Sequence, residues 1–209
     1  MTLRIDKISK RYGNQWALRD VTLDVAKGEV YGIFGATGSG KTTLLRCIAG
    51  KEQTNGGSVS ADASDGIFLA ERAKPSGLAA VFGRNSTALS DGEASVDLVR
   101  RGLSSGKEVV LLDEPFFSVD SAARAALVAE IRDHSAKGNA VLIASSQFGE
   151  LADICDRMCV LVRGEAGQTG TPQEVYDDPA NSAVASIAGT NNLFEARRVT
   201  STMPNCRNS

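Results

Sequence analysis

Apolar and polar positions along this chain predict short strands separated by helices. Alternating apolar residues indicate two opening strands, one around Leu3–Ile8 and one around Val21–Val25. Short apolar runs, typical of buried strands in a parallel sheet, follow at Val30–Phe34, Val109–Leu112 and Ala140–Ala144. Weaker strands are predicted at Ser58–Ala61, Ile67–Ala70, Leu78–Phe82, Met158–Val162 and near Gln168. Strands that alternate with helices indicate the α/β class.

Helices are predicted where apolar residues recur with helical spacing and capping residues stand at the ends. Thr43–Ala49 has this spacing and leads to Gly50, a residue type favoured just past the end of a helix. Ser90, followed three residues later by Glu93, forms a capping box, and the same open helix start is also a good anion site. The apolar side of that helix is formed by Val96, Leu98, Val99 and Leu103.

A longer helix is predicted at Ser121–Lys137, ended by Gly138. Its inward positions are Ala122, Ala126, Leu127 and Ile131. His134, the only histidine, stands among charged residues and is expected to be exposed. A short helix is predicted at Glu150–Cys155, and a second capping box with a proline, Thr171–Glu174, begins another.

The stretch between the third strand and the first helix carries the clearest chemistry. Gly35, Gly40, Lys41 and Thr42 satisfy the phosphate-loop pattern G-x-x-x-x-G-K-[ST], with a strand before it and a helix after it. Glycines let backbone N–H groups point at phosphate oxygens, and the helix N-terminus favours anions. Lys41 is expected to reach the β- and γ-phosphates, and the Thr42 hydroxyl to ligate Mg²⁺. The residues expected to bind the nucleotide are Gly35, Ala36, Thr37, Gly38, Ser39, Gly40, Lys41, Thr42 and Thr43. The alternative is a glycine-rich turn that binds nothing, and the flanking strand and helix disfavour it.

Two carboxylates follow the apolar run at Val109–Leu112. Open α/β sheets bind ligands at the carboxyl ends of their strands, which is where Asp113 and Glu114 stand. Asp113 can hold Mg²⁺ and Glu114 can orient or deprotonate an attacking water. Carboxylates at such a place are often only solvated, but the phosphate loop upstream favours the functional interpretation.

Two large aromatics, Tyr12 and Trp16, lie in a turn-like stretch upstream of the phosphate loop. An aromatic there can stack on a nucleobase, or it can serve as a lid over a small sheet. Position alone does not separate these two roles.

The composition of the chain limits the classes of partner and the cellular location that can be expected. A net charge of −2 argues against nucleic acid, because binding to a phosphate backbone normally leaves a basic footprint. No apolar run approaches the length of a membrane span, and the first residues lack the apolar block of a signal peptide. Four cysteines without zinc-site spacing are expected to be reduced thiols, so a cytoplasmic protein is expected.

Taken in order, the phosphate loop, L-S-D-G-E, V-V-L-L-D-E-P and the Ser118–Asp120 turn resemble the ATP-binding subunits of ABC transporters over nearly the whole chain. L-S-D-G-E resembles the family signature, V-V-L-L-D-E its Walker B strand and Phe117–Asp120 its D-loop. Tyr12 matches the family's adenine-stacking aromatic. The stretch that begins G-T-P-Q-E-V-Y is similar to importer ATPases of the sugar, sulfate, polyamine and ferric-iron type.

The resemblance implies a P-loop NTPase fold of the ABC ATPase type, with a mostly parallel core sheet flanked by helices and a small antiparallel β-subdomain. Two copies, or one copy and a paired ABC ATPase subunit, would sandwich two ATP molecules with Mg²⁺ and drive an integral membrane permease from the cytoplasmic face of the cell membrane. Ser90 and Gly92 would contact the nucleotide held by the partner. The remaining roles implied by the family are nucleotide contact for Asp120 and Ser146, metal binding for Thr42 and Asp113, and catalysis for Glu114 and Lys41.

Four departures from the family separate nucleotide binding from hydrolysis. Only G-R-N-S-T-A separates Phe82 from Leu89, so the helical subdomain expected there is largely missing. The other departures are Gly83 in place of the loop glutamine, Ser146 in place of the switch histidine, and Asp91 and Glu93 in place of the signature glycine and glutamine. The phosphate loop, Asp113 and Tyr12 are intact, so binding is expected to survive these losses better than hydrolysis does.

We therefore expect residues 1–189 to form an ABC-type ATP-binding domain and residues 190–209 to be a C-terminal tail, the stub of a missing small β-domain. The leading hypothesis is an importer subunit that binds and hydrolyses ATP, with weakened turnover. The alternative is a degenerate nucleotide-binding module with a regulatory or structural role. A soluble ABC protein acting on DNA or ribosomes is disfavoured by the single nucleotide-binding unit and the acidic charge.

Overall fold

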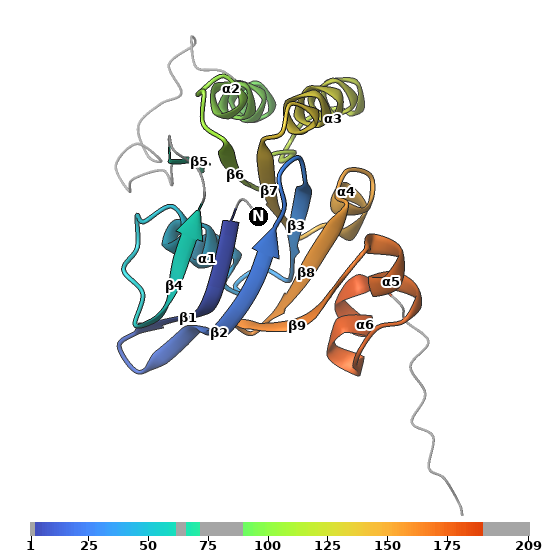
Figure 1. Ribbon diagram of the computed structural model, residues 1–209. Helices are drawn as coiled ribbons and strands as arrows, with labels where there is room; N and C mark the ends of the chain where they lie inside the picture. Colours follow the sequence, from blue (N-terminus) through green and yellow to red (C-terminus); the bar gives the residue numbers. More distant parts are fainter. Residues whose placement is uncertain (1–2, 62–65, 72–89, 190–209) are drawn as a thin grey trace, which may run out of the picture.

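The computed structural model describes residues 3–61, 66–71 and 90–189, which form two sheets with helices packed around them (Figure 1). The strands are β1 (Leu3–Tyr12), β2 (Gln15–Val25), β3 (Val30–Phe34), β4 (Gly56–Ala61), β5 (Ile67–Ala70), β6 (Val109–Asp113), β7 (Ala140–Ser145), β8 (Arg157–Val162) and β9 (Glu165–Gly170). The helices are α1 (Lys41–Ile48), α2 (Asp91–Leu103), α3 (Ser121–Ala136), α4 (Phe148–Ala152), α5 (Pro172–Asp177) and α6 (Ser182–Ala188).

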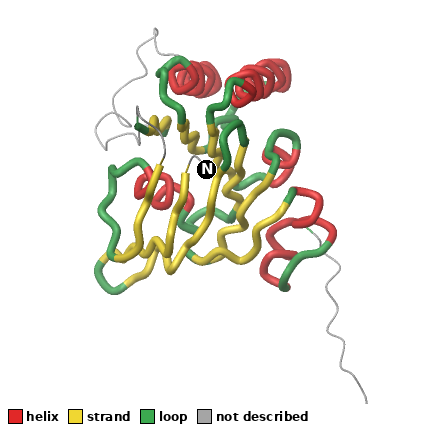
Figure 2. The backbone as a smooth tube through the Cα atoms, in the orientation of Figure 1, coloured by secondary structure: helices red, strands yellow, loops and turns green. Residues whose placement is uncertain are grey.

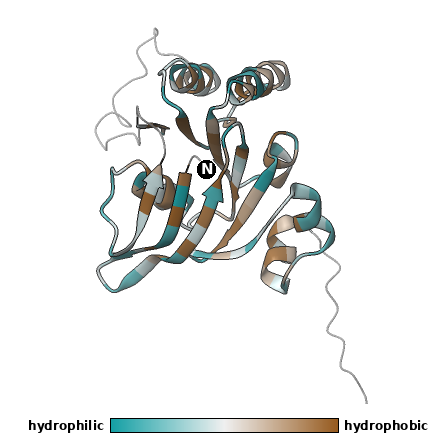
Figure 3. Ribbon diagram, in the orientation of Figure 1, coloured by the Kyte–Doolittle hydropathy of each residue, from teal (hydrophilic) through white to brown (hydrophobic). Residues whose placement is uncertain are grey.

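Among the described residues, the larger sheet has six strands in the order β5-β6-β7-β3-β8-β9. All neighbouring strands are parallel except β9, which pairs antiparallel with β8. Strands β3, β6 and β7 are buried along their whole length, as their unbroken apolar character requires. This is the predicted mostly parallel core sheet, and its strands β6 and β7 are coloured mostly as hydrophobic in Figure 3.

The smaller sheet is antiparallel, with the order β2-β1-β4 in the described part of the chain (Figure 2). Its first two strands form a hairpin that turns at Gly13, with Tyr12 opposite Gln15. This is the predicted small β-subdomain. The hairpin strands are longer than predicted, so Tyr12 and Trp16 lie within strands and not in a turn-like stretch.

Alternate residues of β3 face opposite sides of the large sheet, and each side has its own core. Tyr31 and Ile33 pack with α1 and the small sheet in one buried cluster. Val30 and Phe34 pack with residues of α2–α6 in the other. Helix α1 and the small sheet therefore cover one face, and the remaining helices cover the other.

Helix ends follow the sequence signals. Gly50 follows α1 with φ of 68°, the left-handed conformation that glycine adopts without strain. Both capping boxes form, Ser90 with Glu93 and Thr171 with Glu174. The strands at Ser58–Ala61 and Ile67–Ala70 are present as β4 and β5, whereas Leu78–Phe82 lies outside the described residues.

Several predictions about helices were wrong. His134 is buried, 9% exposed, because it continues the inward stripe of Leu127 and Ile131 on α3. Ala122 and Ala126 are exposed instead. The short helix α4 begins at Phe148 and ends before Cys155, and α6, capped by Asn181, was not predicted.

Candidate functional site

The phosphate-loop residues connect the end of the central strand β3 to the start of α1. Close packing demands glycine at both ends of the loop. A Cβ atom on Gly35 would lie 2.5 Å from the Leu161 carbonyl oxygen, and one on Gly40 would lie 2.7 Å from the Ala17 carbonyl oxygen. Gly40 also has φ of 109°. The first turn of α1 carries no acidic residue and its cap makes no side-chain hydrogen bond, so this helix end suits an anion.

Lys41, the first residue of α1, is held inside the loop. Its side chain is 7% exposed, and its Nζ donates to the carbonyl oxygen of Gly35 at 2.7 Å and to that of Ala36 at 3.3 Å. The same ammonium lies 3.5 Å from Glu114 Oε1. Lys41, the loop carbonyl groups and the Glu114 carboxylate are thus brought together.

Thr42 and Asp113 meet directly between α1 and the end of β6. The Thr42 hydroxyl donates to Asp113 Oδ2 at 2.7 Å. The other carboxylate oxygen, Oδ1, is buried and has no hydrogen-bond partner among the described residues. Burial raises the pKa of Asp113, with the neighbouring Glu114 adding to the shift, while Thr42 and Lys41 oppose it.

A hydroxyl group beside a carboxylate oxygen that no described residue hydrogen-bonds is an arrangement that fits a hard cation. Mg²⁺ takes oxygen ligands and is typically held by one or two protein groups plus phosphates and water. Thr42 and Asp113 would be those groups. Within the described residues, no cluster of three or more histidine, cysteine or acidic side chains provides another metal site.

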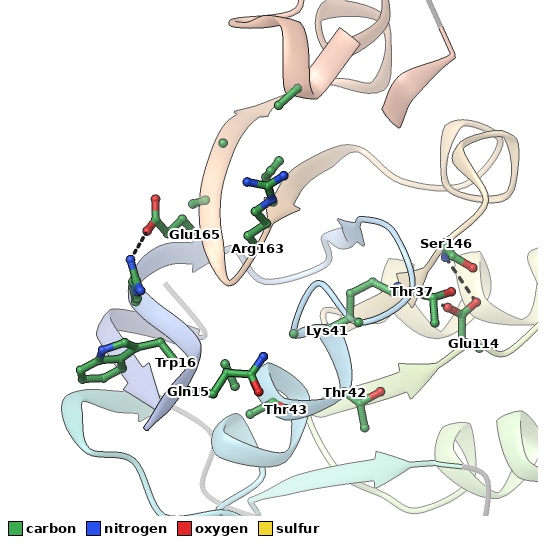
Figure 4. Close-up of a pocket in the computed structure, with 18 of the residues that line it drawn as sticks. Gln15, Trp16, Thr37, Lys41, Thr42, Thr43, Glu114, Ser146, Arg163 and Glu165 are labelled. Carbon is green, nitrogen blue, oxygen red and sulfur yellow. Dashed lines mark hydrogen bonds and ion pairs between the residues drawn. The ribbon is translucent and has the colours of Figure 1, made fainter. Parts of the chain in front are cut away.

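Glu114 lies just past β6, in a left-handed conformation with φ of 49°. Its backbone N–H donates to the Ala144 carbonyl oxygen at 2.9 Å, which fixes the residue against β7. Its Oε2 accepts from the backbone N–H of Ser146 at 3.3 Å (Figure 4). Glu114 is therefore aimed between Lys41 and the loop after β7, where the switch residue is expected.

An open pocket of about 1440 Å³ lies in front of these residues. The predicted nucleotide residues that line it are Tyr12, Thr37, Gly38, Gly40, Lys41, Thr42, Thr43, Glu114 and Ser146. Gly35, Ala36, Ser39 and Asp113 do not line the pocket. Of these four residues, Ala36 is exposed and the other three are buried. Most of the predicted set is thus gathered around one cavity.

The hairpin of the small sheet forms the far wall of this pocket. Tyr12 pairs with Gln15, so the two side chains share one face of the hairpin, while Trp16 pairs with Arg11 on the other. In Figure 4 the Gln15 side chain is directed toward Thr43 and the Trp16 ring points away from the loop. Tyr12, Gln15 and Trp16 all line the pocket, and Gln15 is a pocket residue that was not predicted from the sequence. The signal that could have found Gln15 is strand pairing, because Gln15 stands opposite Tyr12 in the hairpin.

Three predicted nucleotide residues lie elsewhere. Ser90, Gly92 and Asp120 line a second pocket of about 480 Å³ between α2 and the loop before α3. Ser90 is engaged with Glu93, whose Oε2 accepts from its N–H and hydroxyl, both at 2.8 Å. Asp120 caps α3 by accepting from the Ala123 N–H. One chain therefore does not bring these residues onto its own phosphate loop.

The loop after β7 is stiffened by a buried pair that the sequence interpretation did not single out. Ser145 Oγ donates to Glu150 Oε2 at 2.6 Å and accepts from the Gln147 N–H at 3.0 Å. Glu150 is 7% exposed. The pair fixes the short turn that carries Ser146 and its N–H toward Glu114.

Known proteins resemble this chain in sequence and in fold. The family model described as ABC transporter matches residues 18–76. The sulfate/thiosulfate import ATP-binding protein CysA of Bacillus cereus is 31% identical over 246 residues, covering 94% of this chain and 69% of that protein. The Fe(3+) ions import ATP-binding protein FbpC of Streptomyces coelicolor is 30% identical over 239 residues, covering 93% and 69%.

The alignment with the Bacillus cereus protein is longer than the matched part of this chain. Because 94% of 209 residues is about 196, about 50 of the 246 aligned positions have no counterpart here. The number of unmatched positions is comparable to the several dozen residues of the helical subdomain that the sequence indicates as largely missing.

Solved structures share the fold. The crystal structure of a nucleotide-free ATP-binding cassette from an ABC transporter superposes with a TM-score of 0.75 at 21% identity, covering 89% of this chain and 98% of that one. The dimeric structure of an ATP-binding cassette in a post-hydrolysis state, bound to ADP and Pi, gives 0.67 at 18% identity, covering 81% and 98%. Among the described residues, no helix has the length and apolar character that crossing a bilayer requires.

Proposed function

Because this chain belongs to the ABC transporter family of ATP-binding proteins, we propose that it binds Mg-ATP at its phosphate loop and hydrolyses it to power a solute importer. The observation that carries the proposal is the trio of Lys41, Thr42 and Asp113. A buried carboxylate oxygen of Asp113, which has no hydrogen-bond partner in the described ranges 3–61, 66–71 and 90–189, stands beside a hydroxyl and an ammonium at an open helix N-terminus.

Each residue of the trio and its neighbour has a task in this proposal. Lys41 exchanges its loop-carbonyl and Glu114 contacts for β- and γ-phosphate oxygens and stabilises the charge that develops during transfer. Mg²⁺, when bound by Thr42 and Asp113, neutralises phosphate charge. Glu114, released from Lys41 and still fixed by its backbone, orients the attacking water and accepts its proton.

The two separate pockets support a dimer as the working form. Tyr12 and the loop Gly35–Thr43 serve one nucleotide, with Ser146 beside its terminal phosphate. Ser90, Gly92 and Asp120 lie in the second pocket and would serve the nucleotide of a partner subunit, either a second copy or a paired ABC ATPase. Opening and closing of this sandwich would act on an integral membrane permease.

The importer assignment and the location are inferred from relatives. The relatives named above import sulfate or thiosulfate and Fe(3+) ions, so a small inorganic solute is the class of cargo proposed here. The protein would then work in the cytoplasm at the inner face of the cell membrane. Residues 1–189 would be the ATP-binding domain and residues 190–209 its tail.

A second candidate function, a module that binds ATP with little turnover, is favoured by one observation. Ser146, at the switch position, offers Glu114 a backbone N–H at 3.3 Å and no imidazole. Removing one preorganised contact to a transition state typically costs about 2.7–4 kcal/mol, or roughly 10²–10³ in rate. The module shares the fold and the nucleotide site but not the transport cycle.

One experiment tests the proposal against the alternative. Nucleotide affinity, steady-state ATPase rate and oligomeric state are measured for the wild type and for Glu114→Gln. The transport proposal expects turnover above background in the wild type, loss of turnover with retained affinity in the variant, and an ATP-dependent dimer that accumulates in the variant. Tight binding with background turnover that the variant leaves unchanged selects the module, and absence of binding by folded protein refutes both.

A further inference from the structure

Lys10, on β1, is a buried cation outside the nucleotide pocket. Its side chain is 11% exposed, and its Nζ lies 2.7 Å from both Glu52 Oε1 and the Gln53 carbonyl oxygen. The same ammonium lies 4.9 Å from the centre of the Tyr12 ring, within the range of a cation–π interaction. Lys10 therefore joins the segment after α1 to the aromatic ring at the end of β1.

The segment after α1 is itself fixed to β1. The Asn55 N–H donates to the Ser9 carbonyl oxygen at 2.8 Å, and the Asn55 side chain accepts from the Arg11 N–H at 2.8 Å. The hydrogen bond between Glu52 and Lys10 raises the pKa of Lys10 and lowers the pKa of Glu52, so the pair stays charged at neutral pH. The segment that carries both partners of the ammonium, Glu52 and Gln53, is thus itself held against β1.

Tyr12, not Lys10, faces the nucleotide. Tyr12 lines the pocket and is 48% exposed, whereas Lys10 does not line it. A half-exposed aromatic would ordinarily sample several rotamers, and freezing them on binding costs free energy. A fixed ammonium packed on the ring restricts its rotamers before the nucleotide binds, so less free energy is lost on binding.

We propose that Lys10, anchored by Glu52 and the Gln53 carbonyl, is a positioning residue that holds the Tyr12 ring ready to stack on the nucleobase of ATP. The inference rests on the proposed function, since it concerns the same nucleotide site. The proposal also links the phosphate end of the nucleotide to its base end through helix α1. Helix α1 offers its N-terminus to the phosphates, and the segment after its C-terminus anchors the cation behind the base-stacking ring.

The test separates base contacts from phosphate contacts by using two probes, ATP and inorganic tripolyphosphate, each with Mg²⁺. Lys10→Met keeps the length of the side chain and removes the charge. It is expected to weaken ATP binding about three- to tenfold, the range of the cost of ordering one side chain on binding, and to leave tripolyphosphate binding unchanged. Lys10→Arg, which can keep both the ion pair and the cation–π contact, is expected to restore most of the ATP affinity.

Two further variants make the comparison specific. Lys51→Met is the matched control. It removes the same charge one residue before Glu52, from an exposed lysine whose partner Glu71 also pairs with Arg46, and it should change neither affinity. Glu52→Gln leaves Lys10 itself unchanged but removes the charge that anchors it, on a side chain that also hydrogen-bonds Tyr12. It should reproduce the selective loss of ATP affinity, which keeps the test open if Lys10→Met folds poorly.

A double-mutant cycle with Tyr12→Ala reports whether Lys10 acts through the ring. In the Tyr12→Ala background, Lys10→Met is expected to cause no further loss. Equal weakening of both probes, no weakening of ATP binding, or additive losses in the cycle would each overturn the inference. A wild type that binds tripolyphosphate as tightly as ATP would also overturn it while leaving the phosphate site intact, and a wild type that binds neither would overturn the proposed function with it.

Discussion

Asp113→Asn is expected to stabilise the ligand-free protein while impairing its function. Asp113 is 9% exposed, and one of its oxygens is buried without a partner in the described part of the chain. Burial raises its pKa above the ordinary value of 3.8, which means that the ionised form is disfavoured in the folded state. Asparagine keeps the shape and the acceptor for Thr42 and removes the charge.

The magnitude follows from the burial of that oxygen. Leaving a buried polar group unpaired costs about 1–3 kcal/mol. Because the asparagine amide is also polar, the substitution recovers only the lower part of that range. We therefore expect a gain of about 1 kcal/mol in the free energy of unfolding. For a chain of this size that raises the melting temperature by roughly 2–4 °C.

The sign of this stability change can be checked by measuring its dependence on pH. An acid whose pKa is raised on folding destabilises the protein once the pH is above that pKa, and the penalty disappears as the pH falls toward the value of 3.8 in the unfolded chain. The advantage of the variant should therefore be largest at neutral pH and shrink in acid.

Calorimetric melting with and without Mg-ATP provides the assay. A ligand at one hundred times its Kd stabilises the folded state by about 2.7 kcal/mol. The wild type should show such a gain, and Asp113→Asn should lose the part that depends on Mg²⁺. Glu114→Gln is the matched control, because it removes a charge from the next, partly exposed residue and should change the ligand-free melting temperature less. A lower melting temperature for ligand-free Asp113→Asn would refute the reasoning, since ionised Asp113 would then be a stabilising partner of its neighbours.

Three other perturbations test separate parts of the structure. Glu93→Gln should keep the capping box with Ser90 while removing a carboxylate from the second pocket. Because hydrogen bonds from Ser90 lower the pKa of Glu93, urea unfolding should show a small loss of stability, and the ATP-dependent dimer should form more readily; an unchanged dimer fraction would contradict this. Gly92→Ala would place a Cβ atom 2.4 Å from the Ser118 carbonyl oxygen, so urea unfolding should show a loss of about 1–3 kcal/mol, and an unshifted midpoint would contradict the close approach. Burial lowers the pKa of His134, so the neutral form is favoured in the fold. The contribution of His134 to stability should be complete above about pH 6.5 and be lost as the pH drops through the folded-state pKa. His134→Gln should flatten that part of the profile of urea midpoint against pH, and an equally steep profile would count against it.

Elements that depend on local chemistry could be predicted from the sequence. The buried strands β6 and β7 are unbroken apolar runs, and Gly50 ends α1 because its left-handed φ suits glycine. Ser90 and Thr171 cap helices through hydrogen bonds to residues three positions away, so a four-residue pattern contains the whole interaction. The phosphate loop is of the same kind, since strand, glycines, lysine and helix start are contiguous.

Elements that depend on partners distant in the sequence could not be predicted from the sequence. His134 is polar, yet its place in the stripe with Leu127 and Ile131 decides its burial, and only the packing of α3 on the sheet shows this. Ala122 and Ala126 are too small for hydropathy to fix which way they face. Likewise Lys10 was not identified as a candidate, because its partners Glu52 and Gln53 are more than forty residues away.

Calorimetric titration of the folded chain with ATP, with and without Mg²⁺, tests the central claim most directly. The arrangement of Lys41, Thr42 and Asp113 predicts binding of one nucleotide per chain that Mg²⁺ strengthens and that Lys41→Ala abolishes or severely weakens. Wild-type protein that retains its cooperative unfolding and gives no heat of binding with ATP or ADP would contradict the account.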